Sequence, residues 1–257
     1  MYLDKIVDQH RTAALADTRD LDKLISQAKI SLPPRGFEKR LRQDSVTKLA
    51  VIAEIKRRSP SKGVLKSDLN PKVIADQYQQ GGASCLSILT DIEFFGGSEK
   101  DLEDARQAVD LPILRKDFTV SSKDICDAKI MNADCVLLIV AALDKTELKD
   151  LHGLAASLSL DVLVEIHDEK ELEVALEIGA NLIGVNQRDL KTFEVDHQRA
   201  LRMANKMPSH VVRIAESGVK TRDDAQSLRD AGYHAILVGE SLVTSTNIAK
   251  SLRELLV

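Results

Sequence analysis

Eight short apolar runs alternate with longer amphipathic stretches through most of the chain, and this alternation limits the fold more than any other feature of the sequence. The runs are rich in β-branched residues, and the stretches between them carry apolar residues at helical spacing. Eight strands that are each followed by a helix indicate an α/β fold of the (β/α)8, or TIM barrel, class, and a doubly wound open sheet is the main alternative. The predicted strands cover 49–55, 84–89, 112–115, 135–140, 162–166, 182–185, 211–215 and 235–238, and the predicted helices cover 71–80, 99–109, 122–131, 145–158, 169–178, 196–206, 222–230 and about 244–255.

Four predicted helix ends support the barrel. Gly82, Asn132, Gly179 and Gly232 each lie between a predicted helix and the next strand, at a spacing of about two βα units. Glycine and asparagine readily adopt the left-handed conformation that closes a helix. Residues 1–48 precede the repeating units and are predicted to form helices in front of a single barrel domain that spans 1–257.

Charge and apolar patterning exclude several classes of protein. The 36 basic and 40 acidic residues give a net charge of −4 with no basic block, so no nucleic-acid partner is expected. No apolar stretch is long enough to cross a membrane and the N-terminus lacks a signal-peptide core, which predicts a cytoplasmic protein. The three cysteines are odd in number and lack CxxC spacing, so we expect them to be buried and to form neither a disulfide framework nor a zinc site. A small anion is the expected partner, and a monomer is the expected state.

The first predicted strand ends in ionisable side chains. Residues two apart in a strand share a face, so Glu54 and Lys56 line up with Ile52 on one side. The carboxyl ends of parallel strands are where folds of this kind place their chemistry, so the pattern predicts a functional site. A purely structural ion pair at the barrel mouth is the alternative interpretation.

Other predicted strands also end in polar residues or glycine. The third strand leads to Lys116 and Phe118 if Leu114 faces the interior. The last inward positions of strands five to eight are Glu165, Asn186 with Arg188, Glu216 with Ser217 and Gly218, and Gly239.

Buried lysines and glutamates can supply acid–base chemistry, because burial and neighbouring charges move their pKa values toward neutrality. The carboxylates could instead neutralise the lysines, in which case Glu54 and Glu216 would position groups while Lys116 and Glu165 would react.

Two short turns after the last two strands predict an anion site. The turns 216–218, Glu-Ser-Gly, and 238–241, Val-Gly-Glu-Ser, each contain a glycine that lets backbone amides approach a ligand. In many TIM barrels the loops after strands seven and eight hold a phosphate. A sugar phosphate is therefore the expected substrate.

His167 shares a strand face with Glu165, but it directly precedes Asp168 and Glu169, and we interpret it as a cap of the next helix. The sequence contains no HExxH, GxSxG, P-loop or GxGxxG motif.

The strand-end residues lie in motifs that resemble those of the indole-3-glycerol phosphate synthase family across essentially the whole chain. These motifs are AEIKRRSPSKG (53–63), SILTD (87–91) with FFGGS (94–98), LRKDF (114–118), LVE (163–165), GVNQRDL (184–190), AESG (215–218) and VGES (238–241). The resemblance implies a TIM barrel whose residues 1–48 form a helical extension over the barrel mouth. It also implies ring closure of 1-(2-carboxyphenylamino)-1-deoxyribulose 5-phosphate to indole-3-glycerol phosphate, with loss of carbon dioxide and water and with no cofactor or metal.

The resemblance further implies roles for the charged motif residues. Lys116 would be the general acid that protonates the ketone as the aromatic carbon attacks it, and Glu165 would assist the proton transfers of dehydration. Lys56 would bind the anionic substrate and is a second candidate for proton transfer, so which lysine is the acid at each step stays open. The remaining members of this group are Glu54 and Asn186, which would orient reacting groups, and Glu216, which would support the lysines and hydroxyls.

Binding residues follow from the same resemblance. The phosphate would be held by Ser59 and by the backbone around Ser217, Gly218, Gly239 and Glu240. Because the Glu240 carboxylate would repel a phosphate, only its backbone amide is expected to bind. Arg188 would lie near the polar end of the substrate, and the apolar wall for the anthranilate ring would consist of Pro60, Leu89, Phe95 and Phe118.

Two other functions compete with this one. Phosphoribosylanthranilate isomerase, or another phosphate-binding barrel, would favour cysteine and aspartate at the strand ends, where this chain offers lysine and glutamate. A barrel that binds a sugar phosphate without turnover is the second alternative, and the set of Lys56, Lys116 and Glu165 argues against it.

Overall fold

The computed structural model of the chain describes residues 2–189 and 192–257. Met1 and Leu190, which belong to the sequence patterns above, lie outside the described residues. Eight parallel strands close into a barrel in the order β1 (Ala50–Ile55), β4 (Cys85–Leu89), β5 (Ile113–Lys116), β6 (Cys135–Ile139), β7 (Asp161–Ile166), β8 (Leu182–Asn186), β9 (Val212–Glu216) and β10 (Ala235–Val238). Because β10 pairs with β1, the sheet has no free edge, which confirms the (β/α)8 fold over the open sheet.

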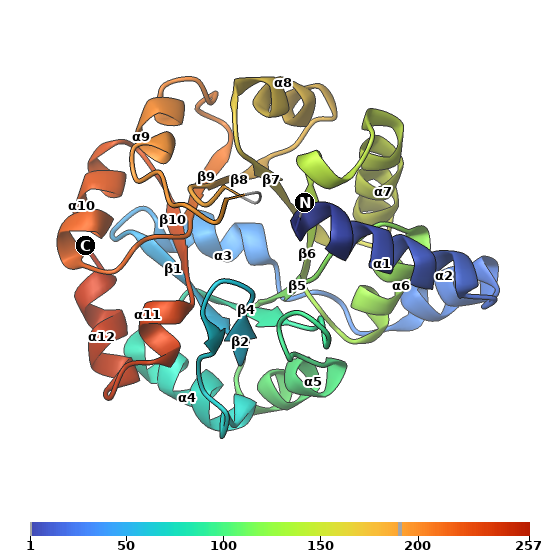
Figure 1. Ribbon diagram of the computed structural model, residues 1–257, viewed down its shortest axis with the longest axis horizontal. Coiled ribbons are helices and arrows are strands. Elements are labelled where there is room, and N and C mark those ends of the chain that lie inside the picture. Colours follow the sequence, from blue (N-terminus) through green and yellow to red (C-terminus); the bar gives the residue numbers. More distant parts are fainter. Residues whose placement is uncertain (1, 190–191) are drawn as a thin grey trace.

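A ring of helices surrounds the strands (Figure 1). The helices that follow the strands are α4 (Pro71–Gly81), α5 (Glu99–Ala108), α6 (Ser122–Ile130), α7 (Lys145–Ser157), α8 (Glu169–Glu177), α9 (Arg199–Ala204), α10 (Arg222–Asp230) and α12 (Ile248–Leu255). A 3-10 turn (Val140–Ala142), the short helix α11 (Glu240–Val243) and a hairpin of β2 (Arg58–Ser59) and β3 (Gly63–Val64) lie in the loops after β6, β10 and β1.

Alternate residues of each strand face two separate apolar layers. In β1, Ala50 and Ile52 belong to the cluster inside the barrel, while Val51 and Ala53 pack in the larger cluster between the strands and the helices. This two-residue period confirms the predicted inner face, and it carries Glu54 to the inside at the carboxyl end of the strand.

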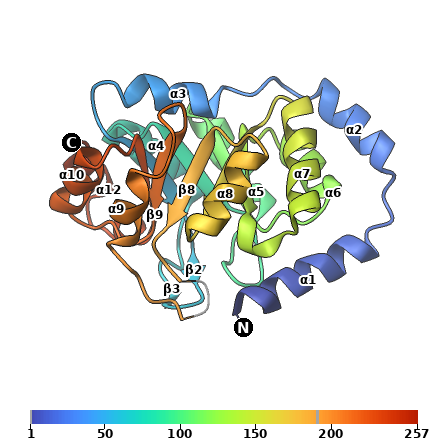
Figure 2. The ribbon, with the colours of Figure 1, turned by 90° about the horizontal axis from the view of Figure 1, so that it is seen from above.

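The N-terminal extension contains three helices, α1 (Tyr2–Ala16), α2 (Leu21–Ile30) and α3 (Phe37–Asp44). The first helix contributes to the pocket at the barrel mouth, and α2 packs against α6. Figure 2 shows α1 and α3 at opposite ends of the barrel. Phe37 and Leu41 of α3 are fully buried in the interior cluster. The structure therefore differs from the expected placement of the whole extension over the mouth, because the apolar face of α3 plugs the other end.

Local signals at the helix ends are confirmed. Gly82, Asn132, Gly179 and Gly232 all have positive φ, between 62° and 94°. Two of the later helices are shorter than predicted. Residues 196–198 form a turn, in which the Asp196 carboxylate accepts a hydrogen bond from the Gln198 backbone at 3.0 Å, so α9 begins later. The stretch that begins at residue 244 becomes helical only at Ile248, after the cap residue Asn247.

The three cysteines, Cys85, Cys126 and Cys135, are buried and free, as the sequence predicted. Among the helices formed by the described residues, none is both long and apolar enough to cross a membrane.

Candidate active site

A pocket of about 330 Å³ opens where the carboxyl ends of the barrel strands meet, a volume at the lower end of the range for small-molecule sites. Every residue that the sequence assigned to chemistry or binding lines it: Glu54, Lys56, Ser59, Pro60, Leu89, Phe95, Lys116, Phe118, Glu165, Asn186, Arg188, Glu216, Ser217, Gly218, Gly239 and Glu240. The structure thus brings the whole set together, while the role of each residue stays a prediction.

Glu54 and Lys56 form an ion pair inside the pocket. Lys56 Nζ donates a hydrogen bond to Glu54 Oε1 at 2.6 Å, and the Ser87 hydroxyl lies 3.4 Å from Glu54 Oε2. A Cβ atom at Gly239 would lie only 2.5 Å from Glu54 Oε1, so glycine makes room for this carboxylate. The sequence left two interpretations of Glu54 and Lys56 open, a structural ion pair or part of a functional site. In the structure the two residues form an ion pair and also line the pocket.

Lys116 extends from the end of β5 toward Glu165 on β7. Its Nζ donates to Glu165 Oε2 at 3.4 Å, and Asn186 Nδ2 donates to Glu165 Oε1 at 3.0 Å. Leu114, two residues before Lys116, packs in the interior cluster, which confirms the condition on which the inward direction of Lys116 depended. Both oxygens of the Glu165 carboxylate are thus held by hydrogen bonds.

The charge of Lys116 is set by the carboxylates around it. Burial lowers the pKa of Lys116, but Glu165, Glu216 and Glu54 together raise it above the ordinary value for lysine. The expectation that a buried lysine moves toward neutrality is therefore wrong for Lys116, and the alternative, in which the carboxylates neutralise the lysines, describes the site better.

The two neighbouring glutamates differ in charge. Burial raises the pKa of Glu165, but Lys116, His167 and the Asn186 amide bring it below the ordinary value. For Glu216, burial and the negative charge of Glu165 raise the pKa to about 8. At neutral pH Lys116 is therefore cationic, Glu165 is anionic, and Glu216 mostly carries a proton.

Asn186 connects the reactive side of the pocket to the loop after β9. Its Oδ1 accepts hydrogen bonds from the Arg188 backbone at 3.0 Å and from the Ser217 hydroxyl at 2.9 Å. Since Nδ2 donates to Glu165, these contacts fix the orientation of the amide. Arg199 Nη1 donates to the Asn186 carbonyl at 2.8 Å and holds its backbone.

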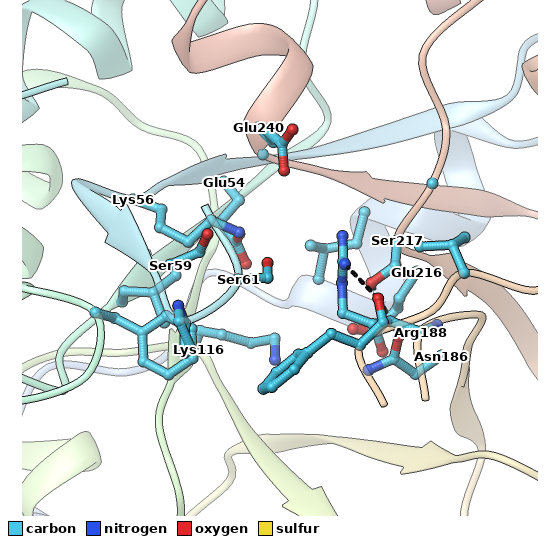
Figure 3. Close-up of a pocket in the computed structure, with 18 of the residues that line it drawn as sticks. Glu54, Lys56, Ser59, Ser61, Lys116, Asn186, Arg188, Glu216, Ser217 and Glu240 are labelled. Carbon is cyan, nitrogen blue, oxygen red and sulfur yellow. Dashed lines mark hydrogen bonds and ion pairs between the residues drawn. The ribbon is translucent and has the colours of Figure 1, made fainter. Parts of the chain in front are cut away.

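One of the two turns predicted to hold phosphate, residues 216–218, has a backbone shape that suits an anion. Ser217 and Gly218 both lie in the left-handed region, with φ of 67° and 82°, and such turns can form anion-binding concavities from backbone amides. The Glu240 carboxylate lies 3.8 Å from Lys62 Nζ, which offsets its negative charge beside this cradle. In Figure 3, Lys56 and Ser59 lie on one side of the pocket, with Arg188, Glu216 and Ser217 on the other.

The predicted apolar wall is formed by residues of three loops and one strand end. Leu89 ends β4, Pro60 lies in the loop after β1, and Phe95 and Phe118 follow β4 and β5. The rings of Phe95 and Phe118 are tilted toward each other, with centroids 6.2 Å apart. An aromatic substrate ring would therefore meet aromatic side chains beside Lys116.

Several lining residues were missed by the sequence reasoning. Leu137 and Ile139 of β6 follow the two-residue inward period that begins at Cys135, a signal that could have identified them. Leu237 of β10 follows the same period from Ala235. Five others lie inside the quoted motifs without having been assigned to the site, and these are Ser61, Lys62, Asp117, Val238 and Ser241. The sequence offered no comparable signal for the rest, which are Tyr2, Leu3 and Ile6 of α1, Phe193, Val195, His197, Val219 and Lys220.

His10 fixes α1 to the mouth. Its Nε2 lies 3.1 Å from Asp91 Oδ2 and 3.8 Å from Asp117 Oδ1, at the ends of β4 and β5. These three side chains are close enough to hold a metal ion. Both carboxylates already have partners, however, since Asp91 accepts from the backbone of Phe94 and Asp117 accepts from Arg115. The cluster is explained by its role in attaching the helix.

His167 does not cap the helix that follows it. The N-cap of α8 is Asp168, whose side chain accepts from the Glu171 backbone at 3.0 Å. The His167 ring instead lies between the carboxylates of Glu165 and Glu171. The interpretation of His167 as a cap is therefore wrong, because the neighbouring aspartate is the better acceptor.

A closed (β/α)8 barrel with lysines and glutamates gathered at the carboxyl ends of its strands defines a protein of the TIM barrel class. The chain belongs to the indole-3-glycerol phosphate synthase family, whose model matches residues 3–255. The function is therefore ring closure of 1-(2-carboxyphenylamino)-1-deoxyribulose 5-phosphate with decarboxylation and dehydration, the carboxy-lyase step that yields indole-3-glycerol phosphate in tryptophan biosynthesis.

Solved structures of other proteins share the fold. A thiamine phosphate pyrophosphorylase from Pyrococcus furiosus is 17% identical, with a TM-score of 0.61 over 83% of this chain and 95% of that one. An N-acetylmannosamine-6-phosphate 2-epimerase from Clostridium perfringens is 15% identical, with a TM-score of 0.60 over 77% and 90%. A 3-hexulose-6-phosphate synthase is 15% identical, with a TM-score of 0.65 over 80% and 98%. At these identities the likeness concerns the fold alone.

Proposed function

We propose that Lys116 is the general acid of the ring closure. The observation that carries this proposal is its position: the ammonium group lies 3.4 Å from Glu165, with the aromatic wall beside it. As the aromatic carbon attacks the ketone, the carbonyl oxygen gains negative charge, and a proton from Lys116 would neutralise it. The raised pKa keeps the acid protonated through neutral pH, and the developing alkoxide is basic enough to take the proton.

The later steps need a base and a second proton donor. Loss of carbon dioxide restores the aromatic ring. Lys56, the second candidate for proton transfer, would then protonate the new hydroxyl so that it leaves as water. Glu165, which is anionic at neutral pH, would remove the proton that this dehydration releases from the substrate. Glu54 and Asn186 would orient the reacting groups, and Glu216 would support Lys116.

Substrate orientation would depend on the two ends of the pocket. The cradle of Ser59, Ser217, Gly218, Gly239 and the Glu240 amide would hold the phosphate, and Lys56 and Arg188 would hold the polar groups of the substrate. The apolar wall of Pro60, Leu89, Phe95 and Phe118 would hold the anthranilate ring. Fixing both ends brings the aromatic carbon to the ketone and reduces the entropic part of the barrier.

The test compares Lys116→Ala with the wild type. The chain has no tryptophan, so formation of the indole ring can be followed by its fluorescence without background from the protein. We expect kcat to fall by about 10²- to 10⁴-fold, with substrate binding still measurable. Lys100→Ala, which removes an exposed lysine of α5, is the matched control and should retain kcat. Wild-type turnover in Lys116→Ala would remove this residue from the mechanism.

We further propose that the enzyme acts as a monomer in the cytoplasm. All the charged side chains that are proposed to act on the substrate come from this one chain. Three buried free cysteines are compatible with a reducing compartment. Sedimentation at assay concentrations tests the first part, since a dimer with all the activity would contradict it, and fractionation of the source cells tests the second.

A further inference from the structure

The His167 ring lies behind the pocket wall and bridges two carboxylates. His167 Nδ1 lies 3.1 Å from Glu171 Oε2, and His167 Nε2 lies 3.7 Å from Glu165 Oε1. The same Glu171 oxygen accepts the His167 backbone N–H at 2.7 Å, so Glu171 holds both the ring and the main chain. The side chain of His167 is only 13% exposed.

These contacts restrict where the imidazole carries its protons. An ionised Glu171 can only accept, so Nδ1 of His167 must be a donor. The buried Nε2 atom has no hydrogen-bond partner in the part of the chain that the structure describes, and it faces Glu165. The two atoms attract each other when Nε2 is protonated and Glu165 is ionised. They also attract each other when Nε2 is unprotonated and Glu165 is protonated. The protonation states of the two residues are therefore coupled.

We propose that His167 is a positioning residue that controls the protonation of Glu165, with Glu171 fixing the orientation of the ring. This inference rests on the proposed role of Glu165 in dehydration. When the His167 ring is protonated, the imidazolium stabilises the Glu165 carboxylate, which is the form needed to accept a proton. His167 is not among the residues that line the pocket, so it acts through Glu165 rather than on the substrate.

The charged groups around His167 support a protonated ring. Glu165 faces it from β7, Glu171 from α8 and Arg199 from α9. Burial lowers the pKa of His167 and Arg199 lowers it further, but the two glutamates outweigh them and the pKa ends above its ordinary value. The ring is thus cationic over a wider pH range than a free histidine.

A purely structural role would not explain the orientation of the ring. Asp168 caps α8, so the helix does not need the imidazole for its first turn. The backbone N–H of residue 167 would still bind Glu171 after a side-chain substitution. The ring contact that remains to be explained is the one toward Glu165.

The experiment measures kcat against pH for the wild type, His167→Gln and Glu171→Gln. Glutamine at 167 keeps a donor but cannot carry charge, and an opposite charge within about 4–6 Å shifts a carboxyl pKa by about 1–3 units. In both variants we expect the acidic limb of the kcat profile to move up by about one pH unit or more, with KM little changed. The double variant, His167→Gln with Glu171→Gln, should move the acidic limb no further than the larger of the two single-variant shifts. His152→Gln, on α7, is the matched control and should leave the limb in place.

Direct titration of the His167 ring by NMR separates this inference from the role of Glu165. Glu165→Gln should lower the pKa of His167 whatever it does to turnover, because it removes a facing negative charge. An unchanged His167 pKa in Glu165→Gln, or an unmoved acidic limb in His167→Gln and Glu171→Gln, would overturn the inference. Wild-type kcat in Glu165→Gln would overturn the proposed role of Glu165 and with it the functional part of the inference.

Discussion

Gly184→Ala tests whether the position of Glu216 is as tightly determined as the structure indicates. A Cβ at residue 184 would lie 2.0 Å from Glu216 Oε1 and 3.1 Å from Leu163 Cδ1. Real Cβ atoms essentially never lie within 3.0 Å of such a neighbouring atom, so Glu216 would have to move. Its side chain is 2% exposed inside the barrel, and there is little room for that movement.

The expected cost follows from overpacking of a well-filled interior, which is typically about 1–3 kcal/mol. For a protein of this size each kcal/mol lowers Tm by roughly 2–4 °C. We therefore expect Gly184→Ala to lower Tm by several degrees in thermal unfolding followed by circular dichroism, and to lower kcat because Glu216 no longer faces Lys116. Gly153→Ala is the control. This exposed glycine lies inside α7, and no described atom lies within 4 Å of the Cβ that alanine would add, so the substitution should raise the free energy of unfolding by about 0.5–1 kcal/mol.

A double-variant cycle identifies the cause of the loss. In a Glu216→Ala background the carboxylate that blocks the Cβ is absent, so Gly184→Ala should cost much less than it does in the wild type. Equal losses in both backgrounds would refute the argument, since they would place the strain in the backbone of β8 rather than against Glu216.

Two further predictions concern buried charge. Because the pKa of Glu216 is raised to about 8 in the folded protein, the folded state binds more protons than the unfolded state between the ordinary value of 4.5 and about 8, and stability falls as pH rises through that window. Glu216→Gln should remove this part of the pH dependence of Tm, and parallel Tm curves for the two proteins would contradict it. Asp134, fully buried, pairs with Arg106 at 2.5 Å, so Asp134→Ala should cost about 3–5 kcal/mol in urea unfolding, and a cost below about 1 kcal/mol would refute the buried pairing.

The barrel could be predicted from the sequence because its signals are local. A β-branched run such as that of β1 specifies both a strand and its inner face, and a glycine such as Gly82 ends a helix through its own backbone conformation. Helix α9 was predicted too long because the side chain of Asp196 forms a turn that apolar spacing does not record. The position of α3 could not be predicted, since an apolar helix face does not reveal which end of a barrel it covers.

The membership of the pocket could also be predicted, because in a barrel every strand end leads to the same mouth. The protonation states could not be predicted, since they depend on distances between strands that are far apart in the sequence. Lys116 and Glu216 belong to β5 and β9, and only the closed barrel brings Glu165 within reach of both. His167 was misinterpreted for a different reason, since its partners Glu165 and Glu171 are close in the sequence, but the spacing of the residues does not show that the ring lies between their carboxylates.

The charges of the pocket explain why one carboxyl group keeps its proton. Two partly buried lysines, Lys56 and Lys116, line the same pocket as three buried glutamates, Glu54, Glu165 and Glu216. A third carboxylate in a low-dielectric interior would need a partner of its own, and Glu216 Oε1 has no hydrogen-bond partner in the part of the chain that the structure describes. Glu54 is paired with Lys56 and Glu165 with Lys116, so the excess falls on Glu216. In the proposed mechanism a substrate phosphate held by backbone amides would add no demand on Lys116, which would leave Lys116 free to give its proton to the ketone oxygen.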